Sequence, residues 1–229
     1  MIRAVIFDFD GTIGNTLPLC IAAFRRAIEP LAGKQLPDEE IVATFGPSEE
    51  GTIRILAPHA YEQGLADYLN CYRELHDMCP SPFDGIPELL EWLRARGIII
   101  ALVTGKGRRS CSISLEQYGI ARFFDLVETG SPEGPCKPEG IRAVLDRFLL
   151  KPEEAIYVGD TASDVASARS AGVPAVAAPG RKPPTGKPCA GPARTSCSRP
   201  SRPSGSGSKI PSAADPGRDP EAEPGGYFR

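Results

Sequence analysis

Five short apolar runs, each bounded by turn-forming residues, constrain the fold of this 229-residue chain more than any other feature. Runs without polar alternation are typical of strands buried on both faces, as in a parallel sheet. Helical patterns lie beside them at residues 87–96, which end at Gly97, and at 138–148 and 163–171. This alternation predicts a doubly wound α/β sheet. The expected strands are residues 2–7, 98–103, 124–128, 155–158 and 174–178.

A long segment, residues 15–83, separates the first strand from the helix at 87–96 and contains no convincing strand. It is rich in helix formers, and two sets of its apolar residues each fit one face of a helix. Because such faces need each other to be buried, we expect an inserted helical subdomain here, with the core formed by residues 1–14 and 84–178. The two sets are Leu19, Ala22, Ala23, Ala27 and Ile28, and Leu65, Tyr68, Leu69, Tyr72 and Leu75.

The composition changes after residue 178 to Pro, Gly, Ser and Arg. A segment with so few aliphatic residues cannot offset its ordering entropy, so we expect residues 179–229 to be a disordered, low-complexity tail. Two origins stay open. The tail is either natural or the frame-shifted end of a gene, since freely chosen codons for residues 179–209 encode a helix–strand–helix pattern in a shifted frame. The actual codons decide between them.

Composition excludes several classes of protein. A formal net charge of -3 gives no broad basic surface, which argues against nucleic acid or an anionic membrane as partner. Seven cysteines without a Cys-x-x-Cys pair argue against a zinc site or a disulfide framework. No signal-like segment and no apolar run near the ~18 residues of a membrane span are present, so we expect a cytoplasmic protein. Its oligomeric state is left open.

Two carboxylates, Asp8 and Asp10, leave the carboxyl end of the first expected strand, and Gly11 allows a tight turn beside them. Open α/β sheets bind their ligands at this edge. Carboxylates placed there can act on a phosphate as a nucleophile and as a proton donor. The ordinary alternative is an Asp-Gly turn without chemistry.

Three further polar clusters follow later strands. Thr104 and Gly105 suit hydrogen bonding to a phosphoryl oxygen at a helix N-terminus, and Lys137 opens a helix near the same edge. Asp160 and Asp164 offer the hard oxygen ligands that Mg²⁺ prefers. Each cluster taken alone has an ordinary explanation as a helix cap or a solvated charge.

The four clusters taken together, in the order nucleophile, hydroxyl, lysine and acidic pair, resemble the haloacid dehalogenase superfamily. The resemblance covers residues 1–178 and rests mainly on the Asp-x-Asp-Gly-Thr and Gly-Asp-x-x-x-Asp elements. It implies a Rossmann-like core, a small helical cap that closes over the site, and hinges at 15–18 and 80–85. The Thr-Gly-Lys element looks closest to the phosphoglycolate phosphatase and pyrophosphatase branches, whose substrates are small phosphorylated metabolites.

The resemblance also implies roles for individual residues. Asp8 would attack phosphorus and form an aspartyl-phosphate, while Asp10 would protonate the leaving group and then activate water. Thr104, Gly105 and Lys137 would hold the phosphoryl oxygens.

The metal ion implied by the same resemblance is Mg²⁺. Its ligands would be Asp8, the backbone carbonyl of Asp10 and Asp160, with Asp164 as a further ligand or as an orienter of the water shell. The implied activity is a Mg²⁺-dependent phosphatase.

Other activities compete with this one. A dehalogenase generally lacks the second aspartate, so Asp10 favours phosphoryl transfer. A sugar phosphomutase keeps both aspartates and stays an alternative. A phosphonate hydrolase needs a cap lysine, and the cap contains only Lys34, in a loop. A non-enzymatic product, damaged by loss of the final helix and strand, is the other alternative.

Several other cap residues are candidates for a functional role, but the sequence does not assign one to any of them. His59 and His76 are expected to be surface or packed residues. Ser48 is either a helix cap or faces the leaving group, and the cap is slightly favoured. Three arginines could reach a substrate carboxylate, although helical arginines are mostly solvated: Arg25, Arg54 and Arg73.

Overall fold

The computed structural model describes residues 1–178, and all of them fall within one compact unit. The expected tail at 179–229, with its two possible origins, lies outside the described residues. No helix in the described part of the chain is long and apolar enough to cross a membrane. Five cysteines among residues 1–178 are free in this structure: Cys20, Cys71, Cys79, Cys111 and Cys136.

The core is a five-stranded parallel sheet with the order β3-β2-β1-β4-β5. Each expected strand forms, with ends that differ by at most two residues. The α/β class predicted from the apolar runs is therefore confirmed. The strands are β1 Ala4–Phe7, β2 Ile99–Val103, β3 Leu126–Glu128, β4 Ala155–Gly159 and β5 Ala175–Ala177.

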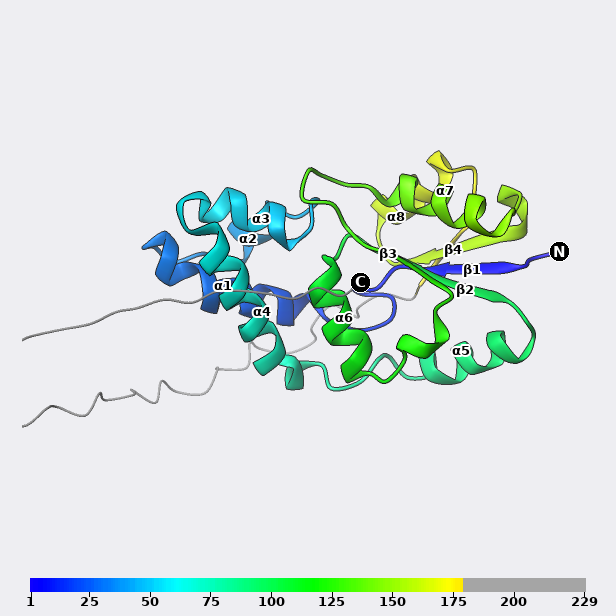
Figure 1. Cartoon of the computed structure of the whole chain (residues 1–229), viewed down its shortest axis with the longest axis horizontal. Helices are drawn as coiled ribbons and strands as arrows, with labels where there is room; N and C mark the ends of the chain where they lie inside the picture. Colours follow the sequence, from blue (N-terminus) through cyan, green and yellow to red (C-terminus); the bar gives the residue numbers. More distant parts are fainter. Residues whose placement is uncertain (179–229) are drawn as a thin grey trace, which may run out of the picture. The chain divides into compact units, whose positions relative to one another are not determined.

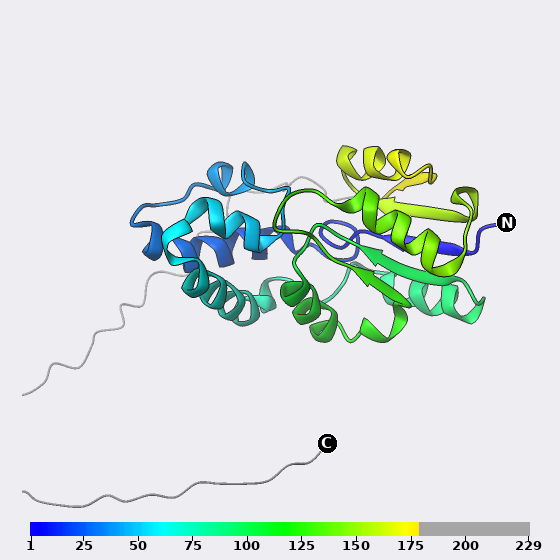
Figure 2. The same cartoon turned by 45° about the horizontal axis from the view of Figure 1, so that its top comes forward.

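Helices cover both faces of this sheet. In Figures 1 and 2, α5 (Ile86–Ala95) and α6 (Arg108–Gln117) lie on one face, and α7 (Lys137–Phe148) and α8 (Ala162–Ser170) lie on the other. Side chains of β1 alternate between the two layers. Ala4 and Ile6 pack in the cluster on the α7 side, whereas Phe7 packs in the cluster on the α5 side.

The segment between β1 and α5 is helical, as predicted, and lies beyond the carboxyl ends of the strands (Figure 1). Its helices form the cap. They are α1 Leu17–Ala32, α2 Asp38–Val42, α3 Glu49–Leu56 and α4 Tyr61–Glu74, with short 3₁₀ turns at Pro58–Ala60 and His76–Met78. Two further 3₁₀ turns, Ala121–Phe123 and Pro152–Glu154, lie in the core.

The cap has its own core, which α1 and α4 build from the two predicted apolar faces. Both faces are largely buried, and Ala22, Leu69 and Leu75 are the half-buried members. At the centre, the rings of Phe24 and Tyr68 lie 4.3 Å apart between centroids. The exact limits of core and cap stay a prediction. The two connecting segments nevertheless meet, because the Phe83 amide donates to the Ile13 carbonyl at 2.9 Å.

The topology places the expected site. Phe7, the last residue of β1, is in register with Leu102 on one side and with Val158 on the other. The connection leaving β1 and the one leaving β4 turn to opposite faces, so β1 stands where the strand order reverses, which is the usual ligand site of such sheets. Polar residues that follow these three strands must therefore lie close together.

The cap core yields a test of stability. We expect Phe24→Ala to lower the free energy of unfolding by about 3–5 kcal/mol, because the side chain is fully buried and its loss leaves a cavity. Urea denaturation measures this loss. The control Ile55→Ala removes a cap side chain that is 60% exposed and should change stability by less than about 0.5 kcal/mol. Equal effects would contradict the assigned packing.

Candidate active site

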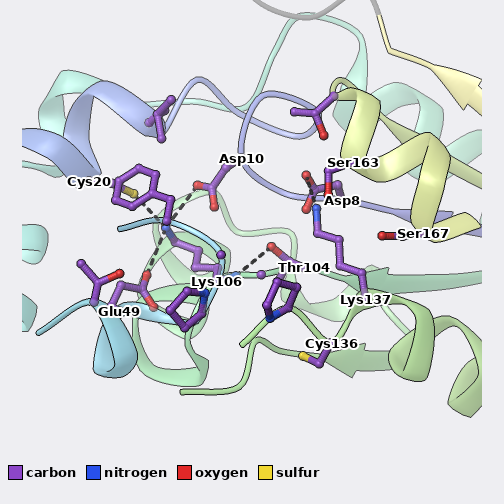
Figure 3. A pocket seen from close by; sticks show the side chains of 18 of the residues that line it. Asp8, Asp10, Cys20, Glu49, Thr104, Lys106, Cys136, Lys137, Ser163 and Ser167 are labelled. Atoms are coloured by element: carbon purple, nitrogen blue, oxygen red, sulfur yellow. Dashed lines mark hydrogen bonds and ion pairs between the residues drawn. The ribbon is translucent and has the colours of Figure 1, made fainter. Parts of the chain in front are cut away.

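Asp8 directly follows β1 and is almost fully buried, with 4% of its surface exposed. Lys137, the first residue of α7, reaches across to it. The lysine Nζ lies 2.9 Å from Asp8 Oδ2 and 2.6 Å from Asp164 Oδ1, so one ammonium group bridges two carboxylates. A proline after Lys137 sets the start of the helix and fixes the point from which the side chain extends. Figure 3 shows Lys137 pointing at Asp8.

Three carboxylates gather at the end of β1 and β4. Asp8, Asp160 and Asp164 each offer an oxygen within 4.8 Å of the others. Asp164 is held in place by the Tyr157 hydroxyl at 3.2 Å and by the backbone and hydroxyl of Thr161. Asp8 Oδ1 is buried and has no hydrogen-bond partner among residues 1–178. A set of hard oxygens with an unpartnered buried member fits a cation such as Mg²⁺.

The turn after Asp10 depends on Gly11. Its φ of 87° is a left-handed conformation that side chains rarely adopt. A Cβ on this residue would also collide with the carboxylate of Asp160. The absence of a side chain therefore lets the β1 and β4 carboxylates approach each other.

Burial dominates the acid–base properties of the cluster. It raises the pKa of Asp8 to about 6, and the nearby Lys137 only partly offsets this. For Lys137 itself burial favours the neutral amine, but Asp8 and Asp164 outweigh it and raise the pKa of the ammonium. Lys137 therefore stays charged, while the pKa of the Asp8 carboxyl depends on the charges that lie beside it.

The remaining expected residues line the same cavity, whose volume is about 310 Å³. Thr104 is buried at the end of β2, and its hydroxyl accepts a hydrogen bond from the Lys106 amide at 3.2 Å. Gly105 follows it in the wall. The structure thus brings the expected residues together. Asp164 contacts Lys137 but does not line the cavity. The other expected residues line it: Asp8, Asp10, Thr104, Gly105, Lys137 and Asp160.

Two charged residues that line the cavity, Lys106 and Glu49, were given no role of their own in the sequence analysis. Lys106 has a fully buried side chain, 3.2 Å from Asp10 Oδ1 and 3.6 Å from Glu49 Oε1. Glu49 opens cap helix α3 and reaches into the core. Lys106 follows Thr104-Gly105, which was a usable signal. Glu49 gave none, because acidic residues in a first helical turn are common.

The cap residues considered as candidates in the sequence analysis do not contact the carboxylate cluster. His76 is packed, with a ring nitrogen 3.0 Å from Ser114 Oγ. Its pKa is lowered mainly by burial and, to a smaller extent, by the positive charge of Lys106. Ser48 donates to Glu50 at 2.6 Å and makes no cap hydrogen bond, although it holds the N-cap position. His59 and the candidate arginines Arg25, Arg54 and Arg73 do not line the cavity.

A helical cap over a buried aspartate, at the reversal point of a parallel sheet, defines the class as a capped α/β hydrolase. The chain belongs to the haloacid dehalogenase-like hydrolase family, whose model matches residues 5–178. It is 31% identical over 173 residues to the pyrophosphatase PpaX of Bacillus pumilus (strain SAFR-032), covering 75% of this chain and 80% of that protein.

Solved structures share the fold. CbbY from Rhodobacter sphaeroides, in complex with phosphate, aligns with a TM-score of 0.68 at 22% identity, over 79% of this chain and 88% of that one. A predicted phosphoglycolate phosphatase from Haemophilus somnus 129PT aligns with a TM-score of 0.60 at 23% identity, over 77% and 84%. The superfamily and phosphatase class expected from the sequence are confirmed by the family match and the phosphatase relatives.

Asp8 makes the stability of the metal-free protein depend on pH. Its pKa of about 6 when folded exceeds the ordinary 3.8, so the folded state binds more protons between these values and stability falls as pH rises through them. We expect a loss on the order of 2–3 kcal/mol by pH 7 from this group. Asp8→Asn, which stays neutral, should avoid it. Urea denaturation in a chelator from pH 4 to 8 measures the difference.

The control for this experiment is Asp146→Asn, an exposed aspartate on α7. Its unfolding free energy should follow that of the wild type across the whole pH range. If the Asp8→Asn profile also runs parallel to the wild type, burial does not raise the pKa of Asp8.

Proposed function

We propose that this protein is a Mg²⁺-dependent phosphatase that hydrolyses a small phosphate monoester through an aspartyl-phosphate on Asp8. The activity would be similar to that of a phosphoglycolate phosphatase. The observation that carries the proposal is the environment of the Asp8 carboxylate. One oxygen is paired with Lys137, the other is buried and has no hydrogen-bond partner in the described part of the chain, and two further carboxylates lie close by.

The first half of the proposed reaction forms the phospho-enzyme. An Asp8 oxygen attacks phosphorus, the bond to the leaving oxygen breaks, and Asp10 gives its proton to that oxygen. Lys137 and the Thr104 hydroxyl stabilise the phosphoryl oxygens as charge builds up on them.

The second half releases phosphate. Asp10, now ionised, takes a proton from water, whose oxygen attacks phosphorus and breaks the bond to Asp8. Mg²⁺ held by Asp8, Asp160 and the Asp10 carbonyl, with Asp164 beside them, would neutralise the charge shared by carboxylate and phosphate. The side chain of Asp10 is oriented for both steps by two donors, the Thr16 hydroxyl and Lys106 Nζ.

The size of the cavity supports a small substrate, and the cap that bounds it would exclude water until the phospho-enzyme forms. Pyrophosphate in the name of the PpaX relative, and phosphate in the CbbY complex, support a phosphorylated one. No arginine among residues 1–178 lines the cavity, so a substrate carboxylate would have no guanidinium partner there. Phosphoglycolate itself is therefore one member of a panel to be tried. The cytoplasmic location stays a prediction.

Loss of the nucleophile gives the direct test. We expect Asp8→Asn to lower kcat for 4-nitrophenyl phosphate by at least about a thousandfold, because the variant lacks the carboxylate that forms the acyl phosphate. Asp146→Asn should keep the wild-type rate. Full activity of Asp8→Asn would refute the mechanism. An inactive wild type without a cooperative melting transition would instead support the damaged-chain alternative, and an isomerised sugar phosphate without phosphate release would support a mutase.

The metal site is tested through Asp160. We expect Mg²⁺ to raise the melting temperature of the wild type, because a ligand that binds only the folded state stabilises it. Asp160→Asn should raise the Mg²⁺ concentration needed for half of that shift by about 10–100-fold, since it removes one anionic ligand. Asp146→Asn is again the control. An unchanged Mg²⁺ response in Asp160→Asn would exclude this residue as a ligand.

A further inference from the structure

Glu49 connects the cap to the core through buried contacts. Its carboxylate accepts hydrogen bonds from the Gly107 amide and from the Ser110 hydroxyl, which lie at the start of α6. Only 8% of the residue is exposed. A Cβ on Gly107 would collide with this carboxylate, so glycine at that position allows the close approach. A carboxylate at a helix N-terminus is electrostatically favourable, which makes the contact a defined docking point.

Lys106 extends this contact to the reacting end of the cavity. Figure 3 shows its ammonium group between Glu49, from the cap, and Asp10, from the core. The ring of Tyr72 lies 4.6 Å from Nζ, and Cys20 Sγ accepts from it at 3.3 Å. Burial alone would lower the pKa of Lys106, but Asp10 and its other neighbours raise it well above the ordinary value. The group therefore stays an ammonium ion.

A lysine side chain is flexible, and its three donors rotate freely, so a single carboxylate does not fix its position. Two carboxylates on opposite sides do. One of the two belongs to α3 and is in place only while the cap is docked. When Glu49 leaves, the buried ammonium keeps Asp10 Oδ1 as an acceptor but loses its second carboxylate, so Lys106 and Asp10 must rearrange or take up water.

We propose that Glu49 is a positioning residue for Asp10, which acts through Lys106 and completes the proton donor only when the cap is closed. The inference rests on the proposed function, in which Asp10 transfers its proton to the leaving oxygen as the bond to phosphorus breaks. Glu49 touches neither substrate nor phosphorus in this role. It makes the position of the Asp10 side chain depend on closure of the cap.

The alternative is that Glu49 only holds the cap and core together. The two roles differ in how they depend on the leaving group. 4-Nitrophenol is acidic and leaves with little help, whereas phenol needs the proton of a general acid. Misplacement of Asp10 therefore slows the cleavage of phenyl phosphate more than that of 4-nitrophenyl phosphate. A loosened cap slows both alike, because the two esters have nearly the same shape.

The experiment compares kcat/KM for these two esters in wild type, Glu49→Gln and the exposed cap control Glu62→Gln. We expect Glu49→Gln to lose about 10–100-fold with phenyl phosphate and less than about threefold with 4-nitrophenyl phosphate. Glu62→Gln should change neither. Equal losses, or no loss, in Glu49→Gln overturn the inference and leave the proposed function intact. A wild type that cleaves neither ester overturns the proposed function, and the inference with it.

Lys106→Met supplies the second measurement. If Lys106 transmits the effect, Glu49→Gln should cost less than about threefold with phenyl phosphate when it is added to Lys106→Met. Full multiplication of the two losses overturns the transmission through Lys106. Urea denaturation of each variant shows whether it is folded. Glu49→Asp, which keeps the charge on a shorter stem, takes the place of Glu49→Gln if that variant fails to unfold cooperatively, and the same ratio of losses decides.

Discussion

The bridge that Lys137 makes between Asp8 and Asp164 is the interaction on which the rest of the structure depends. An isolated carboxylate in a buried position is strongly disfavoured, and Asp8 sits at the centre of the sheet edge. Its surroundings offset part of that cost with the Lys137 ammonium group. The carboxylate of Asp164 holds this ammonium and in turn accepts hydrogen bonds from the Tyr157 hydroxyl and the Thr161 amide. Removal of Lys137 would leave both buried carboxylates without their shared cation.

The fold was largely predictable because its determinants are local. Apolar runs mark the strands, and the carboxyl ends of parallel strands share one edge, so Asp8, Thr104 and Asp160 were expected at that edge. The order of the strands and their register came from the structure. Lys137 was predictable for the same reason, since it opens the helix that follows β3. The strand ends differ by a residue or two, because the hydrogen bonds that define them depend on the neighbouring strand.

The contact between Glu49 and Lys106 was not predictable in this way. It joins residues on different elements, and nothing in either local pattern specifies the other. An acidic residue at the start of a helix is expected to be solvated, and only packing of α3 against the start of α6 buries it. A lysine after Thr-Gly reads as part of a phosphate turn. Its role between two carboxylates becomes visible only when the cap and the core are seen together (Figure 3).

The segment that carries the cap helices begins and ends close together, because the Phe83 amide donates a hydrogen bond to the Ile13 carbonyl. A segment inserted in this way does not alter the order of the strands, and none of its residues pairs with a strand of the sheet. The core can therefore keep one chemical apparatus while this segment is shortened, extended or exchanged. Side chains that reach back across the junction, as Glu49 does to Lys106 and to the start of α6, set the limit to such change.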